Sequence, residues 1–291
     1  MAGGTGAQDA VTVGHLMVQA QAALSGALGL SSSEARIEAQ VLLMRAFGNV
    51  PRAWLIAHQT DMVAPEHLAV FETFLNRRLA GEPVAYILGE REFYGLTFKV
   101  SPVTLIPRPE TELLVELALQ RIPKHGAYRV LDLGTGSGAI ALSIAHARPD
   151  AEVVAVDASA AALEVAQFNT QQLGLGNVRL LHSDWFSALR GERFDIIVSN
   201  PPYIAAADAH LTQGDVRFEP CSALASGADG LDDIRRICAQ AKAHLNANGW
   251  LLFEHGYDQA ARARALLQLS GFAGIFSARD LSGIERVSGG C

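Results

Sequence analysis

The chain has 291 residues, of which 49% are hydrophobic and 18% charged, a balance typical of a globular protein with a sizeable core. The formal net charge is −7, so the composition does not show the excess of positive charge that binds a nucleic-acid backbone. No apolar run approaches the length of about 20 residues that spans a bilayer, and the N-terminus lacks a signal-peptide pattern, so we expect a cytoplasmic protein.

Three cysteines, Cys221, Cys238 and Cys291, are far apart and odd in number. We expect them to be reduced thiols, because a secreted disulfide framework uses paired cysteines. Their spacing does not match a zinc site, and no metal is predicted.

Residues 1–84 are predicted to form a helical domain, with residues 1–10 as a disordered lead-in. Ser31 followed by Glu34 matches a capping box, and Pro65 is placed to open a further helix. The apolar stripes in this region are typical of a small bundle core. No catalytic or metal-ligand spacing occurs there, so we expect recognition rather than chemistry.

Residues 85–108 are predicted to form a linker. The stretch 86–100 is aromatic, β-branched and punctuated by glycine, which predicts a hairpin or a pair of short strands. Three prolines stiffen the residues that follow.

Residues 109–291 are predicted to form an α/β domain. Its apolar runs and helical periodicity predict strands at 128–133, 152–156, 178–182, 194–199 and 250–254, and helices at 110–119, 139–147, 160–173, 231–245 and 259–269. Alternation of this kind predicts a parallel sheet covered by helices on both faces.

A glycine-rich loop, Gly134-Thr135-Gly136-Ser137-Gly138, follows the first of these strands. Such a loop can be a simple tight turn, but it also lets the backbone approach a ligand closely. Asp157 ends the next strand 19 residues after Gly138, where a carboxylate can accept hydrogen bonds from ribose hydroxyls. The loop is tighter than the dinucleotide pattern and Asp132 precedes it, so S-adenosylmethionine is favoured over a dinucleotide.

Asp184 and Trp185 follow the third strand. The carboxylate can accept from an adenine amino group and the indole can flank the ring. Ordinary core packing is the alternative for Trp185, and its place at a third successive strand end favours the cofactor.

Asn200-Pro201-Pro202-Tyr203 ends the fourth strand, because the prolines cannot donate to a sheet. This pattern is common in turns. If the first and fourth strands are neighbours, however, Asn200 faces the glycine-rich loop. The Asn200 side-chain oxygen and the Pro201 carbonyl can then accept the two N–H groups of a planar NH₂, with Tyr203 stacked against it. We therefore expect methylation of such a nitrogen, on a nucleobase or on an amide side chain.

Six sequence blocks resemble a known family, the S-adenosylmethionine-dependent methyltransferases that modify a glutamine side-chain nitrogen (N5) in peptide chain release factors. The blocks are Leu105–Glu112, Gly134–Gly138, Ser183–Phe186, Asn200–Ile204, Gly214–Pro220 and Phe253–Gly256.

The resemblance implies a Rossmann-like class I methyltransferase domain with a seven-stranded, mostly parallel sheet, preceded by a helical substrate-recognition domain and a hairpin. It also implies that S-adenosylmethionine is held by Gly134–Gly138, Asp157, Asp184, Trp185 and Asn200 and leaves as S-adenosylhomocysteine. The glutamine of a Gly-Gly-Gln loop would be bound by Asn200, Pro201, Pro202 and Tyr203. Release factors are then the expected partners of a monomeric enzyme, without a membrane or direct nucleic-acid contact.

Two alternatives carry the same Asn-Pro-Pro-Tyr block. A relative that methylates a glutamine of a ribosomal protein ranks second, because Asp184-Trp185 and Glu254-His255-Gly256 resemble the release-factor type more. Methyltransferases of DNA or RNA amino groups rank third, because they are expected to add a basic recognition region.

Overall fold

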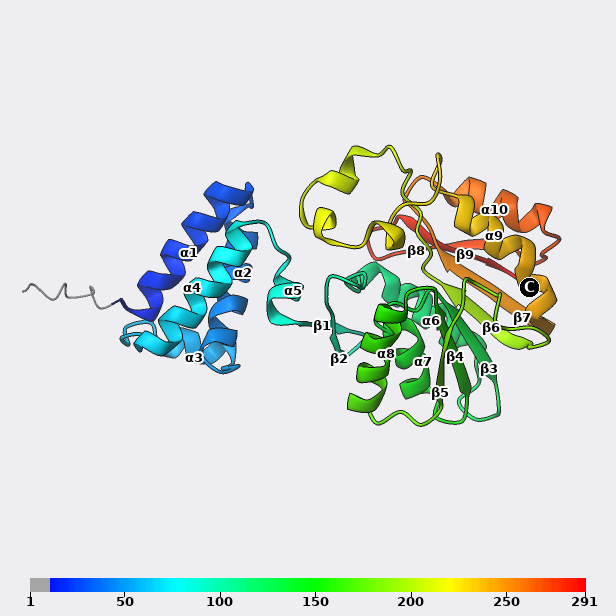
Figure 1. The fold of residues 1–291 in the computed structure, drawn as a ribbon, viewed down its shortest axis with the longest axis horizontal. Helices are drawn as coiled ribbons and strands as arrows, with labels where there is room; N and C mark the ends of the chain where they lie inside the picture. The colour runs from blue at the N-terminus through cyan, green and yellow to red at the C-terminus, as the bar shows by residue number, and fades with distance from the viewer. Residues whose placement is uncertain (1–10) are drawn as a thin grey trace, which may run out of the picture. The chain divides into compact units, whose positions relative to one another are not determined.

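The computed structural model describes residues 11–291, and the lead-in predicted for residues 1–10 lies outside them. The chain divides into two compact units, Met1–Leu88 and Gly89–Cys291. Figure 1 shows a helical first unit and a second unit built on a sheet. Among the described residues, no helix is both long enough and apolar enough to cross a membrane.

Within residues 11–88, the described part of the first unit, there are five helices: α1 (Val13–Leu28), α2 (Ser32–Ala46), α3 (Arg52–Ala57), α4 (Pro65–Leu79) and α5 (Val84–Leu88). The predicted capping box is present. Ser31 Oγ accepts a hydrogen bond from the Glu34 backbone N–H, and the Glu34 carboxylate accepts one from the Ser31 backbone N–H at 2.9 Å. Pro65 is the first residue of α4, as expected.

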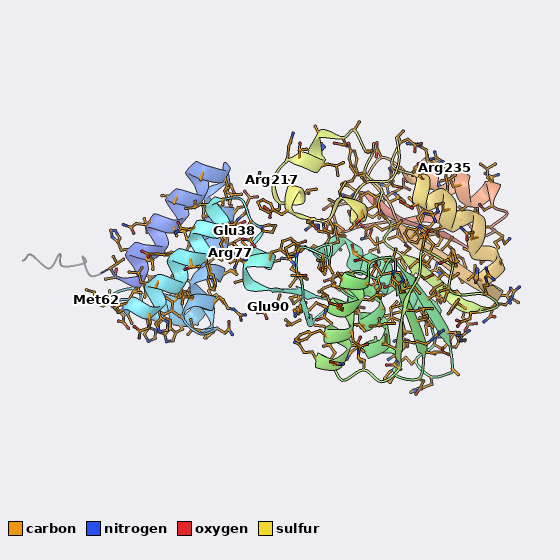
Figure 2. All side chains as sticks on the ribbon, viewed as in Figure 1. Glu38, Met62, Arg77, Glu90, Arg217 and Arg235 are labelled. Carbon is orange, nitrogen blue, oxygen red and sulfur yellow. The ribbon has the colours of Figure 1, made fainter. Side chains whose placement is uncertain are left out.

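The core of this unit is mainly apolar, and it also contains the buried side chains of Gln40 and Arg78. Phe71 of α4 is fully buried against Leu42 and Leu43 of α2 and their neighbours. Glu38 is labelled among the side chains of the helical unit in Figure 2. The guanidinium of Arg78 in α4 donates to the Glu38 carboxylate in α2 at 2.7 Å. Because Arg78 is buried, this bidentate contact satisfies a charge that would otherwise be costly to bury.

The linker differs in part from its prediction. Residues 86–88 were expected in a hairpin but belong to α5, because Pro83 starts a helical turn and its carbonyl accepts from the Tyr86 and Ile87 N–H groups. The hairpin itself is confirmed as β1 (Glu90–Phe93) paired with β2 (Leu96–Lys99). Its two-residue turn has positive φ at Tyr94 (51°) and Gly95 (73°), which is the type I′ pattern.

The second unit contains the seven-stranded sheet that the resemblance implied. Its strands are β3 (Arg129–Leu133), β4 (Glu152–Asp157), β5 (Val178–His182), β6 (Phe194–Ser199), β7 (Leu245–Glu254), β8 (Phe276–Arg279) and β9 (Glu285–Gly290). The order is β5-β4-β3-β6-β7-β9-β8, parallel from β5 to β7 and antiparallel at β9 and β8. The first and fourth strands along the chain, β3 and β6, are therefore neighbours, as expected.

Helices cover both faces of this sheet (Figure 1). They are α6 (Glu112–Arg121), α7 (Ala139–Ala147), α8 (Ala160–Gln172), α9 (Asp232–Ala241) and α10 (Ala260–Leu269). Alternate residues of each strand point to opposite faces, so Val130 packs with α6 and α7 while Leu131 packs with α9 and α10.

Short 3₁₀ turns complete the second unit: Pro109–Thr111, Ala209–Thr212, Asp215–Phe218, Cys221–Ala223 and Lys242–His244. The first leads directly into α6, and the next three belong to the long connection between β6 and α9. The last lies where a longer helix was predicted, because α9 ends at Ala241 and β7 already begins at Leu245. Strand β7 therefore begins five residues before its predicted start at residue 250, and Leu245 pairs with Phe194 across an irregular register. The polar residues Asn246 and Asn248 concealed this extension in the sequence.

Strands β8 and β9 were expected from the resemblance and not from any local pattern. Glycine is unfavourable in a strand, yet β9 ends with Gly289 and Gly290. The cause is close packing, since a Cβ on Gly289 would lie 2.5 Å from Leu252 Cδ2 and 2.7 Å from the Leu251 carbonyl oxygen. The neighbouring strand thus requires glycine at this place.

Candidate active site

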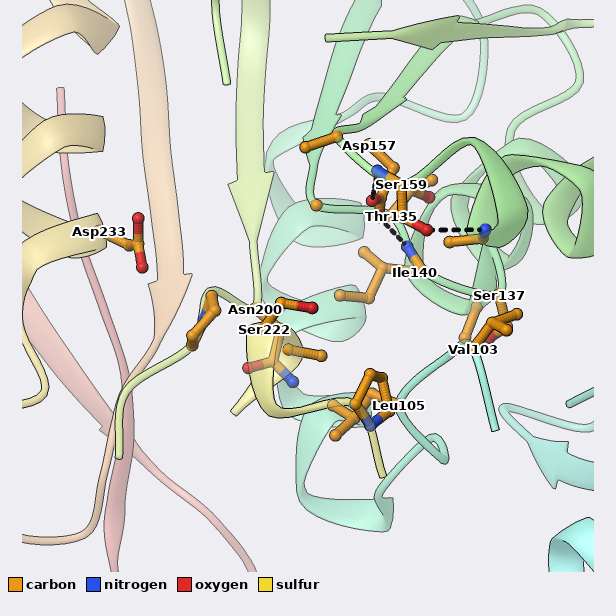
Figure 3. Close-up of a pocket in the computed structure, with 18 of the residues that line it drawn as sticks. Val103, Leu105, Thr135, Ser137, Ile140, Asp157, Ser159, Asn200, Ser222 and Asp233 are labelled. Atoms are coloured by element: carbon orange, nitrogen blue, oxygen red, sulfur yellow. Dashed lines mark hydrogen bonds between the residues drawn. The ribbon is translucent and has the colours of Figure 1, made fainter. Parts of the chain in front are cut away.

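A cavity of about 380 Å³ opens at the carboxyl ends of β3, β4 and β6, a size typical of small-ligand sites. Figure 3 shows side chains from these strand ends and from the segment before α6 around one space. Its walls include the glycine-rich loop, Asp157, Trp185 and Asn200. The strand ends that the sequence singled out therefore meet at one site.

The glycine-rich loop is held by its own backbone. The Gly134 and Thr135 N–H groups both donate to the Val156 carbonyl at 2.9 Å, which fixes the loop against β4. Gly134, Gly136 and Gly138 have φ values of 74°, 57° and 86°, a region that disfavours other residues. The loop can thus present backbone to the cavity without side chains in the way.

Asp132 lies buried beneath this loop at the end of β3. Its Oδ2 accepts a hydrogen bond from Thr135 Oγ1 at 2.7 Å. Burial raises the pKa of Asp132 to about 7, while the Thr135 bond acts in the opposite direction. Thr135 lines the cavity, so the buried carboxylate supports the loop from behind.

Asp157 ends β4 with both carboxylate oxygens oriented by backbone donors. Oδ2 accepts from the Gly136 N–H and Oδ1 from the Ser159 N–H, each at 2.8 Å. A carboxylate has about four acceptor positions, so capacity remains on the cavity side for ribose hydroxyls.

Trp185 packs over the loop in a strained backbone conformation, with φ 50°. A Cβ on Gly134 would lie 3.4 Å from the indole, and the indole N–H donates to Asp233 Oδ1 at 3.2 Å. Asp184 lies on the cavity wall and receives both of its hydrogen bonds from Arg236, at 2.8 and 3.0 Å. The face of an indole beside a carboxylate that accepts hydrogen bonds fits a flat ring with an amino group better than a phosphate group.

Asn200 follows directly after β6 and faces the cavity (Figure 3). Its Nδ2 donates to Thr111 Oγ1 at 3.2 Å. The Thr111 hydroxyl in turn donates to Glu254 Oε2 at 2.6 Å, and the Tyr203 hydroxyl donates to Glu254 Oε1 at 3.2 Å. Three segments far apart in the chain thus fix one carboxamide.

The four residues of the Asn-Pro-Pro-Tyr block occupy different environments. Asn200 and Pro202 line the cavity, whereas Pro201 and Tyr203 are absent from its lining. The Tyr203 N–H donates to the Leu224 carbonyl and its own carbonyl accepts from Gln259 Nε2 at 2.9 Å. Burial raises the pKa of Tyr203, and the negative charge of Glu254 raises it further, so the Tyr203 hydroxyl remains protonated.

A buried carboxylate, Glu219, also joins two segments that line the cavity. Glu219 accepts from the Ile106 N–H at 3.0 Å and forms an ion pair with Arg108. It joins the segment before α6 to the connection after β6, and both line the cavity. Arg108, whose role the sequence left open, therefore has a carboxylate partner within the fold.

Sequence reasoning did not identify Thr111, Glu219 or Glu254 as members of this site. Glu254 had one usable signal, since it is an acidic residue at the carboxyl end of a strand, like Asp157. Thr111 and Glu219 had no local signal, because a threonine before a helix and a glutamate in a loop are common in any fold. Both lie, however, within the blocks Leu105–Glu112 and Gly214–Pro220 that carry the family resemblance.

Comparisons with known proteins agree with this architecture. Residues 110–217 match a family model described as Methyltransferase small domain, and residues 15–89 match the PrmC N-terminal domain. A solved structure of the 16S rRNA N2 G1207 methyltransferase of T. thermophilus, in complex with AdoMet and guanosine, is 26% identical. It has a TM-score of 0.51 and covers 69% of this chain and 49% of that one.

Curated relatives match nearly the full length. A Release factor glutamine methyltransferase from Bordetella pertussis is 55% identical over 90% of this chain and 95% of its own. A relative of the same name from Escherichia coli is 46% identical over 89% of this chain and 92% of its own. The resemblance found in the sequence is confirmed, and the chain belongs to the family of S-adenosylmethionine-dependent release factor glutamine methyltransferases.

Proposed function

We propose that this chain transfers a methyl group from S-adenosylmethionine to the side-chain amide nitrogen (N5) of the glutamine in the Gly-Gly-Gln loop of peptide chain release factors. The observation that carries the proposal is the Asn200 carboxamide, held by Thr111 at the edge of the cavity that the glycine-rich loop also lines. The names of the family relatives support the same substrate.

S-adenosylmethionine supplies an activated methyl group on its sulfonium. In our proposal Gly134–Gly138 approach it with backbone, Asp157 accepts from its ribose, and Asp184 and Trp185 border its adenine. Asn200 lies beside it on the neighbouring strand end.

The substrate amide is proposed to donate its two N–H groups to Asn200 Oδ1 and to the Pro201 carbonyl. The nitrogen lone pair then forms the new N–C bond, the sulfur keeps the electrons of the broken S–C bond, and the nitrogen loses a proton to water. Both acceptors stabilise the positive charge that grows on nitrogen. Pro202 and Tyr203 are proposed to complete this pocket, Pro202 on its wall and Tyr203 through the Glu254 carboxylate.

The helical unit, residues 1–84 in the predicted division, is proposed to recognise the release factor away from the reacting glutamine, across the linker at residues 85–108. We further propose that residues 109–291 carry the chemistry, and that the protein acts as a cytoplasmic monomer without direct nucleic-acid contact.

The decisive experiment supplies S-adenosylmethionine with a labelled methyl group to the full chain and compares four acceptors: a release factor, the same factor with glutamine of the Gly-Gly-Gln loop changed to alanine, ribosomal proteins, and protein-free RNA and DNA. Label is expected on the first alone. Label on ribosomal protein or nucleic acid in preference to the release factor would overturn the proposal.

Removal of residues 1–84 tests the recognition role. We expect methylation of the intact release factor to fall sharply while the remaining chain still binds cofactor. Undiminished methylation of intact factor by the truncated, folded chain would show that recognition lies elsewhere.

A further inference from the structure

The hydrogen bonds between Glu254, Thr111 and Asn200 have a fixed direction. Glu254 is fully buried, and an ionised carboxylate can only accept, so the single proton of the Thr111 hydroxyl is donated to it at 2.6 Å. Thr111 Oγ1 is then limited to accepting. The Asn200 carboxamide must therefore turn its NH₂ towards Thr111, at 3.2 Å, and its Oδ1 away from it.

This direction matters because a carboxamide is nearly symmetric in shape. Rotating the Asn200 amide by half a turn exchanges Oδ1 and Nδ2 at almost no steric cost, so only the hydrogen-bond partner decides which atom faces the cavity. A substrate NH₂ group needs an acceptor there. If Asn200 presented its own NH₂, two donors would meet and the substrate nitrogen would lose one of its two proposed acceptors.

We propose that Glu254 and Thr111 are positioning residues that select, by the direction of their hydrogen bonds, the one Asn200 orientation able to accept from a substrate amide. This inference rests on the proposed function, since it assigns a cause to the orientation on which that function depends.

The groups around Glu254 determine the pH at which its carboxylate is ionised and can orient Thr111 and Asn200. Thr111 and Tyr203 contact it directly, Arg286 of β9 attracts its charge, and Glu110 repels it, while Arg286 is itself paired with Asp280 at 3.1 Å. Burial raises the pKa of Glu254 to about 6, although the hydrogen bonds from Thr111 and Tyr203 lower it. Burial lowers the pKa of the adjacent His255.

Protonation of Glu254 would reverse the chain of hydrogen bonds. A protonated carboxyl can donate to Thr111 Oγ1, the Thr111 hydroxyl can then donate to Asn200 Oδ1, and the Asn200 NH₂ turns to the cavity. Methyl transfer should therefore require the ionised form. At saturating cofactor and release factor, the rate should rise with pH through about 6 and then level off.

The first test changes Thr111 without changing its shape. In a single-turnover assay Thr111→Val should lower the transfer rate by about 10- to 100-fold, the usual cost of losing an outer orienting partner. Affinity for S-adenosylmethionine, measured by calorimetry, should stay as in the wild type. Thr111→Ser, which keeps the hydroxyl, should recover most of the rate.

Thr170→Val is the matched control. Thr170 is also buried, and its hydroxyl donates to the Ala166 carbonyl at 2.8 Å within α8, away from Asn200. It should cost stability but not transfer rate. A purely structural role of Thr111 would make the two variants alike, so equal rates for Thr111→Val and Thr170→Val would overturn the inference.

The second test is the pH profile of Glu254→Gln. A glutamine can accept from Thr111 or donate to it, so Asn200 should occupy both orientations, with a lower plateau rate and no fall in rate below pH about 6. Asp132→Asn controls for the other buried carboxylate and should leave that fall in place. Absence of the fall in the wild type, or its persistence in Glu254→Gln, would overturn the inference even if Thr111→Val does not fold.

These failures differ from a failure of the proposed function. If the wild-type chain does not methylate release factors at any pH, the function is wrong. If it does and the Glu254 and Thr111 variants behave like the controls, only the positioning role is wrong.

Discussion

The cofactor side and the amide side of the cavity each rest on a buried carboxylate that accepts from a threonine hydroxyl. Asp132 accepts from Thr135 at 2.7 Å, and Glu254 accepts from Thr111 at 2.6 Å. The first pair is separated by 3 residues and supports a loop that backbone hydrogen bonds already fix. The second is separated by 143 residues and continues into the side chain of Asn200.

The two sides should respond differently to substitution. On the cofactor side most of the geometry is carried by main-chain N–H and C=O groups, which substitutions do not remove. On the amide side a single side-chain amide is oriented by a single hydroxyl. We therefore expect substitutions on the amide side to change rate, and those on the cofactor side to change affinity or stability.

The largest effect is expected for Asn200→Ala. It removes an acceptor used on the reacting nitrogen, so the transfer rate should fall by about 10²- to 10³-fold, as for other donors or acceptors aimed at developing charge. Cofactor affinity should be preserved. Single-turnover kinetics together with calorimetry check both, and a rate close to that of the wild type would remove Asn200 from the chemistry.

Asp157→Ala should act on affinity instead. The variant loses acceptors for the Gly136 and Ser159 N–H groups and for the proposed ribose contact. Hydrogen bonds to a charged group contribute about 1.5–3 kcal/mol, so the dissociation constant of S-adenosylmethionine should rise by about 10- to 100-fold.

Asp150→Ala provides the matched control, because Asp150 precedes the same strand but its partner is the exposed His125. Its cofactor affinity should match the wild type. An unchanged dissociation constant in Asp157→Ala would contradict the ribose assignment.

Thr135→Val sharpens the contrast with Thr111→Val. It leaves buried Asp132 without its hydroxyl donor, which should lower the free energy of unfolding by about 1–3 kcal/mol. Cofactor affinity should weaken, but the pH dependence of transfer should follow the wild type. Denaturant unfolding measures the first effect, and a pH profile altered as in Glu254→Gln would show that the two threonines are not distinct in role.

The smallest effect on the transfer rate is expected from Asp132, whose titration is measured instead in the pH dependence of stability. Burial raises its pKa to about 7, against about 3.9 in an unfolded chain. Between these values the folded protein holds a proton that the unfolded chain releases, so this contribution to stability is present at low pH and is lost as pH rises through about 7.

Asp132→Asn removes that titration. The difference in unfolding free energy between wild type and variant should therefore change by about 4 kcal/mol between pH 4 and 8, since one pKa unit is about 1.4 kcal/mol and the two pKa values lie about three units apart. A difference that is constant with pH would contradict the raised pKa.

The sequence predicted the cofactor side of the cavity more completely than the amide side. The glycine-rich loop and Asp157 lie at the ends of strands with clear apolar patterns, so their meeting followed from the parallel sheet. The orientation of Asn200 depends on Thr111 and Glu254, 89 and 54 positions away, and no local pattern links residues so distant. The backbone of Trp185, with φ 50°, was equally hidden, because a tryptophan in the left-handed region is set by its packing on Gly134.

The strands of the sheet were likewise predictable only where their own residues have a strand pattern. Strand β6, in which all residues but Asp195 are buried and four of six are apolar, was predicted to the residue. Strand β9 was not, because Ser288, Gly289 and Gly290 have the composition of a loop and are a strand only through contact with β7. Local preference is overridden there by tertiary packing.

Glu219 has a consequence for the order in which the enzyme assembles. Its hydrogen bond to the Ile106 N–H closes a loop of 113 residues, whereas Asp157 reaches Gly136 across only 21. Because longer loops cost more entropy to close, the cofactor side should become protected first during refolding, and the Glu219 wall later. Pulse-labelled hydrogen exchange should therefore protect the Gly136 amide before the Ile106 amide, so that a folding chain gains its cofactor site before its amide site.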